Sequence, residues 1–209
     1  MDRKEFIINS TLAAFAVSIS GCKKDEETTT TTSGGVLTPV EACETTSDIL
    51  GPFYRAGASD RYDLTFAGLT GNVIELKGKV FKEDCSTPIE NALVEIWHCD
   101  TAGAYDNSSS DFKHRGTRSS DVNGDYAFKT ILPGKYKNGT LYRPSHIHFK
   151  ITHPDSEELV SQIYFKNDPH IEDDPWAGTI NAERRILPIT LEDVNGNLAI
   201  EFDISLKNR

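Results

Sequence analysis

Apolar residues recur at every second position in several short segments of this 209-residue chain, and this alternation constrains the fold more than any other feature. The side chains of a β-strand point alternately to its two faces, so a period of two predicts a strand with one buried face. The clearest run lies near the C-terminus, at Leu198, Ile200, Phe202, Ile204 and Leu206.

Shorter alternating runs lie around residues 74–80, 92–96 and 126–128. The dipeptides Asn123-Gly124 and Asn195-Gly196 are signals of tight β-turns, and few segments have a helical period. Several half-buried strands separated by Gly, Pro and Asn turns predict an all-β fold, an antiparallel β-sandwich.

The N-terminus has the features of an export signal. Two basic residues precede an apolar run over residues 6–19, which ends in the sequence Ile-Ser-Gly-Cys at residues 19–22. This ending resembles a bacterial lipobox, which implies cleavage before Cys22 and acylation of its sulfur. The alternative, a buried N-terminal helix, lacks an amphipathic pattern, and the run is short and polar for a membrane span. We expect a lipoprotein signal peptide over residues 1–21 and membrane attachment through lipid on Cys22.

Residues 22–39 are acidic and threonine-rich without apolar periodicity, which predicts a flexible tether before one domain at residues 40–209. Lys23 follows the acylated cysteine, so the aspartate type of inner-membrane retention signal is missing. We expect an exported bacterial lipoprotein of the cell envelope, with the outer membrane favoured and a periplasmic or surface-facing domain. The net charge of −10 and the lack of a Lys and Arg cluster exclude a nucleic-acid surface.

Three cysteines remain for the folded domain, which allows one disulfide in an oxidising compartment and one free thiol. Cys85 and Cys99 bracket a predicted strand and so lie too far apart to pair. Pairing of Cys43 with Cys99 is slightly favoured, and the other pairings stay open.

His146 and His148 are separated by one residue in a predicted strand whose apolar face carries Ile147, Phe149 and Ile151. Side chains at i and i+2 share a face about 6.6 Å apart, so both imidazoles can converge on one metal ion. Two exposed histidines, or a zinc or copper site, would give the same pattern.

Segments in the wider sequence narrow these alternatives. They are residues 51–54 (Gly-Pro-Phe-Tyr), 95–105, 133–136 (Pro-Gly-Lys-Tyr), 143–149 (Arg-Pro-Ser-His-Ile-His-Phe) and 161–165 (Ser-Gln-Ile-Tyr-Phe). In this order the chain closely resembles the intradiol ring-cleavage dioxygenases, the family of protocatechuate 3,4-dioxygenase and catechol 1,2-dioxygenase, over roughly residues 40 to 170. The resemblance implies a prealbumin-like β-sandwich core and cleavage of catechol-type rings with O2 to cis,cis-muconate-type products.

The resemblance also implies a non-haem Fe(III) cofactor with four protein ligands. These are Tyr105, Tyr136, His146 and His148. The family match makes Tyr136 an axial ligand that also accepts a substrate proton. Each tyrosine could also be an ordinary half-buried phenol, an alternative that spacing alone does not exclude. Two phenolates are hard anions, which suits a ferric ion.

Two further residues receive roles from the resemblance. Arg143 matches a pocket arginine that stabilises negative charge on the substrate ring, although strand alternation alone would equally allow a surface arginine. Gln162 matches a catalytic pocket glutamine. Tyr54 and Trp97 either line the substrate pocket or fill the core, and His98 has no assigned role. Residues 106–111 form a short polar loop after Tyr105, which leaves the substrate preference open.

Two other functions compete with a dioxygenase. Residues 87–96 and 121–126 are typical of prealbumin-like extracellular modules, so a non-catalytic binding module is the main alternative. A lipoprotein that stores or senses iron is the second. The helical N-terminal region of catechol 1,2-dioxygenases has no counterpart here, so a dimer built on such helices is not expected and the oligomeric state stays open.

Overall fold

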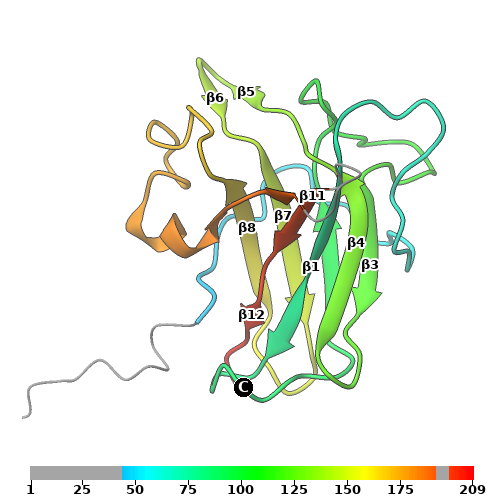
Figure 1. The fold of residues 1–209 in the computed structure, drawn as a ribbon, viewed down its shortest axis with the longest axis vertical. Helices are drawn as coiled ribbons and strands as arrows, with labels where there is room; N and C mark the ends of the chain where they lie inside the picture. The colour runs from blue at the N-terminus through cyan, green and yellow to red at the C-terminus, as the bar shows by residue number, and fades with distance from the viewer. Residues whose placement is uncertain (1–43, 192–197) are drawn as a thin grey trace, which may run out of the picture. The chain divides into compact units, whose positions relative to one another are not determined.

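The computed structural model describes residues 44–191 and 198–209, which form two packed β-sheets and a projecting hairpin (Figure 1). The signal peptide and tether predicted for residues 1–39, including Cys22, lie outside these residues, as does the Asn195-Gly196 turn. Within the part of the chain that is described, no helix is long and apolar enough to cross a membrane.

One sheet is organised around the long strand β1 (Val73–Phe81). On one side β1 pairs antiparallel with β4 (Asp125–Ile131). On the other side it pairs parallel with two short strands, β11 (Leu198–Glu201) and β12 (Ile204–Ser205), and β10 (Thr190–Leu191) pairs antiparallel with β11.

The second sheet has the strand order β3-β2-β7-β8-β9. The strand bounds are β2 (Leu93–Trp97), β3 (Arg115–Ser119), β7 (His146–Thr152), β8 (Leu159–Phe165) and β9 (Ile186–Leu187). A short 3-10 helix over Ile180–Arg185 leads into β9. The hairpin of β5 (Tyr136–Asn138) and β6 (Leu141–Arg143) stands apart from both sheets, at the top of Figure 1.

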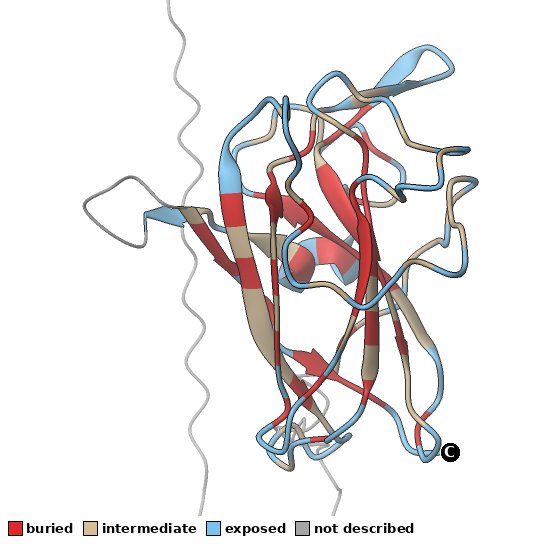
Figure 2. Ribbon diagram, turned by 90° about the vertical axis from the view of Figure 1, so that its right-hand side faces the viewer, coloured by how far each residue is buried: buried red, intermediate tan, exposed pale blue. Residues whose placement is uncertain are grey.

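The core lies between the two sheets. Buried and partly exposed residues alternate along the strands (Figure 2), as the sequence pattern predicts. One cluster joins the inner faces, including Leu76, Phe128, Ile96, Ile147 and Phe149. Burying each such side chain contributes about 1.5–3 kcal/mol, so the cluster holds the sheets face to face. The all-β sandwich expected from the sequence is confirmed.

The pairing within the sheets is mixed rather than wholly antiparallel, because β1 runs parallel to β11 and β12 and β8 runs parallel to β9. The strand expected over residues 198–206 is also interrupted at Phe202 and Asp203. The Phe202 amide donates to the Lys77 carbonyl, and the Asp203 carboxylate accepts from the Lys79 amide. A side-chain bond thus replaces a backbone bond where the strand breaks.

The favoured pairing of Cys43 with Cys99 is wrong. Within the described residues Cys99 is a free, buried thiol, whereas Cys85 is disulfide-bonded. The Cys99 sulfur donates to the Gly134 carbonyl at 3.1 Å, and burial raises the pKa of this thiol to about 12. Cys99 therefore acts as a small buried group in the loop that follows β2.

Candidate metal centre

His146 and His148 lie on the outer face of the second sheet, opposite the core residues Ile147 and Phe149. Both imidazoles are nonetheless fully buried, and their ring centroids lie 4.9 Å apart. Burial, reinforced by the positive charge of Arg143, lowers the pKa of His146 to about 3. Burial also lowers the pKa of His148. Both rings are therefore neutral near pH 7, the form in which imidazole binds a metal.

A backbone carbonyl sets the tautomer of His146. Its Nδ1 lies 2.6 Å from the Pro144 carbonyl oxygen, which can only accept a hydrogen bond. Nδ1 therefore carries the proton and Nε2 has a free lone pair. Nε2 lies 3.3 Å from the Tyr105 hydroxyl, so the basic nitrogen and the phenol face each other.

Tyr105 and Tyr136 approach the histidines from two different segments. Their ring centroids lie 5.7 Å apart, Tyr136 lies 5.5 Å from His146, and Tyr105 lies 6.3 Å from His148. The structure thus brings together all four residues that the sequence singled out as ligands. They come from the loop after β2, from the start of β5 and from β7.

The loop that carries Tyr105 is shaped by Asp100, whose Oδ1 accepts from the Ala102 and Ala104 amides at 2.9 Å. Gly103 has a positive φ of 85°, and a Cβ there would lie 2.5 Å from the Lys135 carbonyl and 3.0 Å from the Tyr136 Cβ. Only glycine permits this close approach. Gly103 therefore lets the two tyrosine-bearing segments lie against each other.

The chemistry of these donors fits a trivalent metal ion. Burial raises the pKa of Tyr105, with further contributions from Cys99 and Tyr136, so its phenolate needs a nearby cation to form. Among residues 44–191 and 198–209, no cluster of three or more His, Cys, Asp or Glu residues could hold a metal. Tyr105, Tyr136, His146 and His148 would hold an ion here through two imidazoles and two phenolate oxygens, and the hard phenolates suit Fe(III).

Arg143 lies beside the four rings and is not a surface residue. Its cross-strand partner in the hairpin is Tyr136, and it is 2% exposed. The guanidinium donates to Asp174 and Tyr164 and stacks over Trp176 at 4.4 Å. Burial opposes the charge, but the hydrogen bond and negative charge of Asp174 outweigh it and raise the pKa of Arg143. Nη1 is buried with no hydrogen-bond partner in the described structure.

Gln162 lies directly across from His148 on β8. Its amide nitrogen donates to the Ile49 carbonyl at 2.8 Å and to Asp48 at 3.2 Å, while its Oε1 lies 3.2 Å from the Tyr164 hydroxyl, which donates to Asp48. The carboxamide is therefore engaged in holding the segment around residue 48 against the sheet.

Tyr54 contacts none of the four candidate ligand rings directly. Its hydroxyl donates to Glu95 at 3.2 Å, and its ring meets Trp97 edge-on at 5.0 Å. Phe53, the preceding residue, instead stacks on Tyr105 at 4.2 Å. The segment at residues 51–54 resembles the family and so indicated an aromatic residue near the ligands. The sequence did not indicate that this residue would be Phe53 rather than Tyr54. His98 is buried between Cys99 and Thr130, to which its ring nitrogens are hydrogen-bonded.

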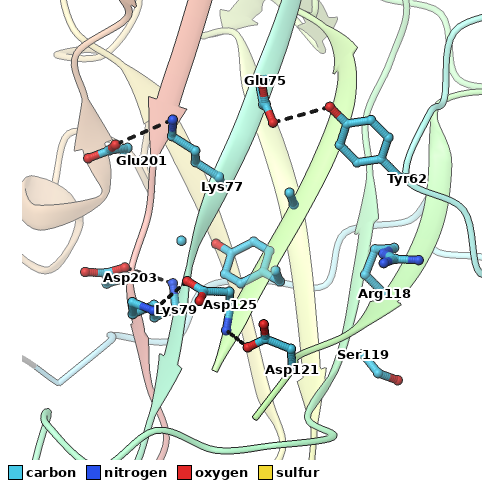
Figure 3. Close-up of a pocket in the computed structure, with 13 residues that line it drawn as sticks. Tyr62, Glu75, Lys77, Lys79, Arg118, Ser119, Asp121, Asp125, Glu201 and Asp203 are labelled. Atoms are coloured by element: carbon cyan, nitrogen blue, oxygen red, sulfur yellow. Dashed lines mark hydrogen bonds and ion pairs between the residues drawn. The ribbon is translucent and has the colours of Figure 1, made fainter. Parts of the chain in front are cut away.

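A separate groove of about 610 Å³ lies on the solvent-facing side of the first sheet (Figure 3). Its charged side chains pair with one another, as Lys79 does with Asp125 at 2.6 Å and Lys77 with Glu201 at 3.9 Å. Exposed pairs of this kind contribute little to stability. None of the four candidate ligands lines this groove, so it is a solvated sheet face distinct from the centre described above.

Comparison with known proteins was made for sequence and for structure. A family model described as Dioxygenase matches residues 49–208. Catechol 1,2-dioxygenase 2 of Acinetobacter lwoffii is 34% identical over 152 residues, which are 62% of this chain and 54% of that protein. The protocatechuate 3,4-dioxygenase beta chain of Burkholderia cepacia is 34% identical over 158 residues, which are 68% and 64% of the two chains. The chain thus spans between about half and two thirds of the length of these relatives.

Two solved structures are similar to the described fold. The dioxygenase domain of a dioxygenase carbohydrate-binding protein fusion from Streptomyces sp. SirexAA-E has a TM-score of 0.69 and 26% identity, covering 79% of this chain and 99% of that one. Catechol 1,2-dioxygenase of Acinetobacter radioresistens has a TM-score of 0.71 and 26% identity, covering 79% and 63%.

Proposed function

The chain belongs to the intradiol ring-cleavage dioxygenase family, and we propose from this that it cleaves catechol-type rings between the two hydroxyl-bearing carbons with O2. Both oxygen atoms enter a cis,cis-muconate-type product. The proposed cofactor is non-haem Fe(III), bound by Tyr105, Tyr136, His146 and His148.

One observation carries this proposal: two buried, neutral imidazoles and two half-buried phenols from three separate segments converge in one cluster. A non-catalytic prealbumin-like module would need no such convergence, because packing of the sandwich already buries the inner faces of both sheets. The cluster lies on the opposite face of β7, where burial of polar rings that are not fully hydrogen-bonded, such as His148, costs a fold without metal chemistry free energy.

A bound ferric ion would supply the positive charge that ionises the phenols and the substrate hydroxyls, and the oxidising character that makes the ring react with O2. The neutral imidazoles of His146 and His148 would hold the ion through their lone pairs. With the ion bound, Tyr136 would be a phenolate that accepts the proton of one substrate hydroxyl, and the second proton would pass to solvent. Tyr136 thus serves as both ligand and general base.

Arg143 supplies a fixed positive charge at the edge of this cluster. Asp174 and Trp176 hold two sides of its guanidinium, and its unpartnered Nη1 is a hydrogen-bond donor for a substrate that becomes anionic. Gln162 holds the segment around Ile49 against the sheet through the Ile49 carbonyl, and Tyr54 packs on Trp97, the ring that stacks on His148.

The N-terminal sequence supports a second part of the proposal. We infer that the protein is an exported lipoprotein, anchored through Cys22 to a membrane of the cell envelope, with the outer membrane favoured. Its substrates would be small catechols outside the cytoplasm. The tether between Cys22 and the domain would leave the site accessible to solvent-borne substrate.

Metal analysis of the purified protein combined with an oxygen electrode tests the proposed function. The expected result is about one iron per chain, a red colour from phenolate-to-iron charge transfer, and O2 uptake when catechol is added. A protein that stays colourless and inert after reconstitution with Fe(III) would refute it and favour the binding module. Iron without O2 uptake on a panel of catechols would favour iron storage or sensing.

A further inference from the structure

The two candidate imidazoles are held in different ways. His146 donates a hydrogen bond from Nδ1 to the Pro144 carbonyl, which fixes its tautomer and its ring orientation. The corresponding Nδ1 of His148 is buried, yet it has no hydrogen-bond partner among the described residues. Such an outer hydrogen bond normally orients a metal-binding histidine. A different kind of contact must therefore orient His148.

Trp97 provides the first of these contacts. It is the cross-strand neighbour of His148 on β2, and the two rings are nearly parallel, with centroids 4.8 Å apart and planes 7° apart. Trp97 is itself 2% exposed, and Tyr54 packs edge-on against its indole. The indole is thus a rigid wall against one ring face of His148.

Gly51 provides the second contact. A Cβ at this position would lie 3.1 Å from Cε1 and 3.7 Å from Nε2 of His148, closer than an ordinary contact for the former. Gly51 also has a positive φ of 72°, a conformation that other residues rarely adopt. Its bare backbone therefore lies directly against the imidazole, and a side chain there would push the ring.

Phe53 extends the same segment to the tyrosines. Its ring stacks on Tyr105 with centroids 4.2 Å apart and planes 19° apart, and it meets Tyr136 edge-on at 5.8 Å. Residues 51–53 thus contact three of the four candidate ligands within three positions of the chain.

Buried polar contacts anchor this segment on both sides. Before it, the Asp48 carboxylate accepts from Arg185 at 2.7 Å, in a pair whose side chains are 3% and 2% exposed, and from Tyr164 at 2.9 Å. After it, the Phe53 carbonyl accepts from Arg115 at 2.7 Å. A segment fixed at both ends can hold the rings that it touches.

We propose that residues 51–53 and Trp97 form a positioning element, here called the ring clamp, which orients His148 by packing and holds Tyr105 by stacking. The role of the ring clamp in iron binding rests on the proposed function, because only then are the rings that it orients metal ligands. Its effect on His148, however, is a property of the protein alone and can be measured without metal.

The metal-free test uses NMR of the His148 ring protons. In the wild type, stacking under the indole shifts these signals upfield and gives one set of lines. Trp97→Leu keeps an apolar, although smaller, side chain but removes the stacked ring, so the shift should disappear, whereas Trp97→Phe should retain part of it. Gly51→Ala should move or broaden the same lines. Gly68→Ala is the matched control, because Gly68 has a similar φ of 84° with no atom within 4 Å of an added Cβ.

The second test measures Fe(III) affinity by competition with a chelator. Loss of a group that orients a ligand typically weakens metal binding about 10- to 100-fold. We expect that loss for Gly51→Ala and Trp97→Leu, a smaller one for Trp97→Phe, and none for Gly68→Ala. Circular dichroism of each apo variant confirms that the fold is intact.

The ring clamp is overturned if folded Gly51→Ala and Trp97→Leu proteins keep the wild-type His148 signals and bind iron with wild-type affinity. A Gly51→Ala variant that does not fold leaves the decision to the Trp97→Leu and Trp97→Phe pair, which places no side chain at a positive φ. A wild type that binds no iron would refute the proposed function, and the NMR comparison would still decide whether the ring clamp exists.

Discussion

Arg143 and Asp174 form an ion pair that water scarcely reaches. Nε of the arginine lies 2.8 Å from Oδ2 of the aspartate, and the two side chains are 2% and 1% exposed. The same carboxylate accepts from the Trp176 and Ala177 amides at 3.0 and 2.8 Å, so the loop after β8 closes around it. The positive charge of Arg143, next to the four candidate ligands, is therefore held in place by Asp174.

Asp174→Asn should destabilise the protein strongly, because it leaves a buried guanidinium without a counter-charge. Removing one member of a buried pair costs about 3–5 kcal/mol. Asp60→Asn is the control, since its pair with Arg118 is 65% and 40% exposed and should contribute about 1 kcal/mol or less. Urea unfolding of both variants measures the difference, and equal losses would contradict the burial of the Arg143 pair.

Tyr136→Phe should reduce turnover about 10²- to 10⁴-fold, the usual contribution of a general base, while the fold is retained. Tyr142→Phe changes a 43% exposed tyrosine on the same hairpin and should leave turnover unchanged. O2 uptake with catechol measures both variants, and circular dichroism checks the fold. Equal turnover in the two variants would mean that Tyr136 is not a catalytic ligand.

Removal of the metal should abolish both the colour and O2 uptake without unfolding the sandwich, because the core between the sheets contains none of the ligands. Fe(III) should restore both properties. Zn(II) should restore neither, because it cannot be reduced or give phenolate charge transfer. His146→Ala should prevent reconstitution, whereas His153→Ala, beyond the end of β7, should not. Recovery of activity with Zn(II) would argue against the ferric site.

The free energy of unfolding should fall as the pH drops below 6.5, in part because of His98. Burial, reinforced by the charge of His114, lowers the pKa of His98 from 6.5 to about 3. Between these pH values His98 is protonated in the unfolded chain but neutral in the folded chain, so the unfolded state gains stability as the pH falls. The resulting loss between pH 6.5 and 4 is about 3 kcal/mol.

His98→Gln should flatten this part of the pH dependence, since glutamine does not titrate. Urea unfolding of the apo protein at a series of pH values measures the slope. The same slope in the variant and the wild type would show that His98 is accessible to protons in the folded state.

Cys22→Ala should release the protein from the membrane fraction of a bacterial host and prevent incorporation of labelled fatty acid, because the thiol is the proposed site of acylation. Purified iron content and O2 uptake should be unchanged, since the tether contributes no proposed ligand. Continued membrane attachment with no label in either protein would exclude the lipid anchor.

Much of the fold was predictable because strand alternation is a local property. The pattern around residues 74–80 and 146–151 predicted which side chains face the core, and Ile147, Phe149 and Ile151 lie there. The break at Phe202 was not predictable from alternation. A Cβ at Gly78 would overlap the Phe202 carbonyl, so the break lies where two segments distant in sequence approach each other closely.

Some features of the candidate site were likewise predictable from the sequence, and others depend on the tertiary structure. The sequence by itself determined that His146 and His148 share one strand face, because a period of two leaves no other arrangement. The resemblance of the sequence to the dioxygenase family predicted Tyr105 and Tyr136 as further ligands. Only the tertiary structure decided that this outer face is buried, because the covering loops come from residues far away in the chain. The contacts of Gly51 and Trp97 with His148, and of Asp174 with Arg143, depend on how those segments pack, and no local pattern encodes such distances.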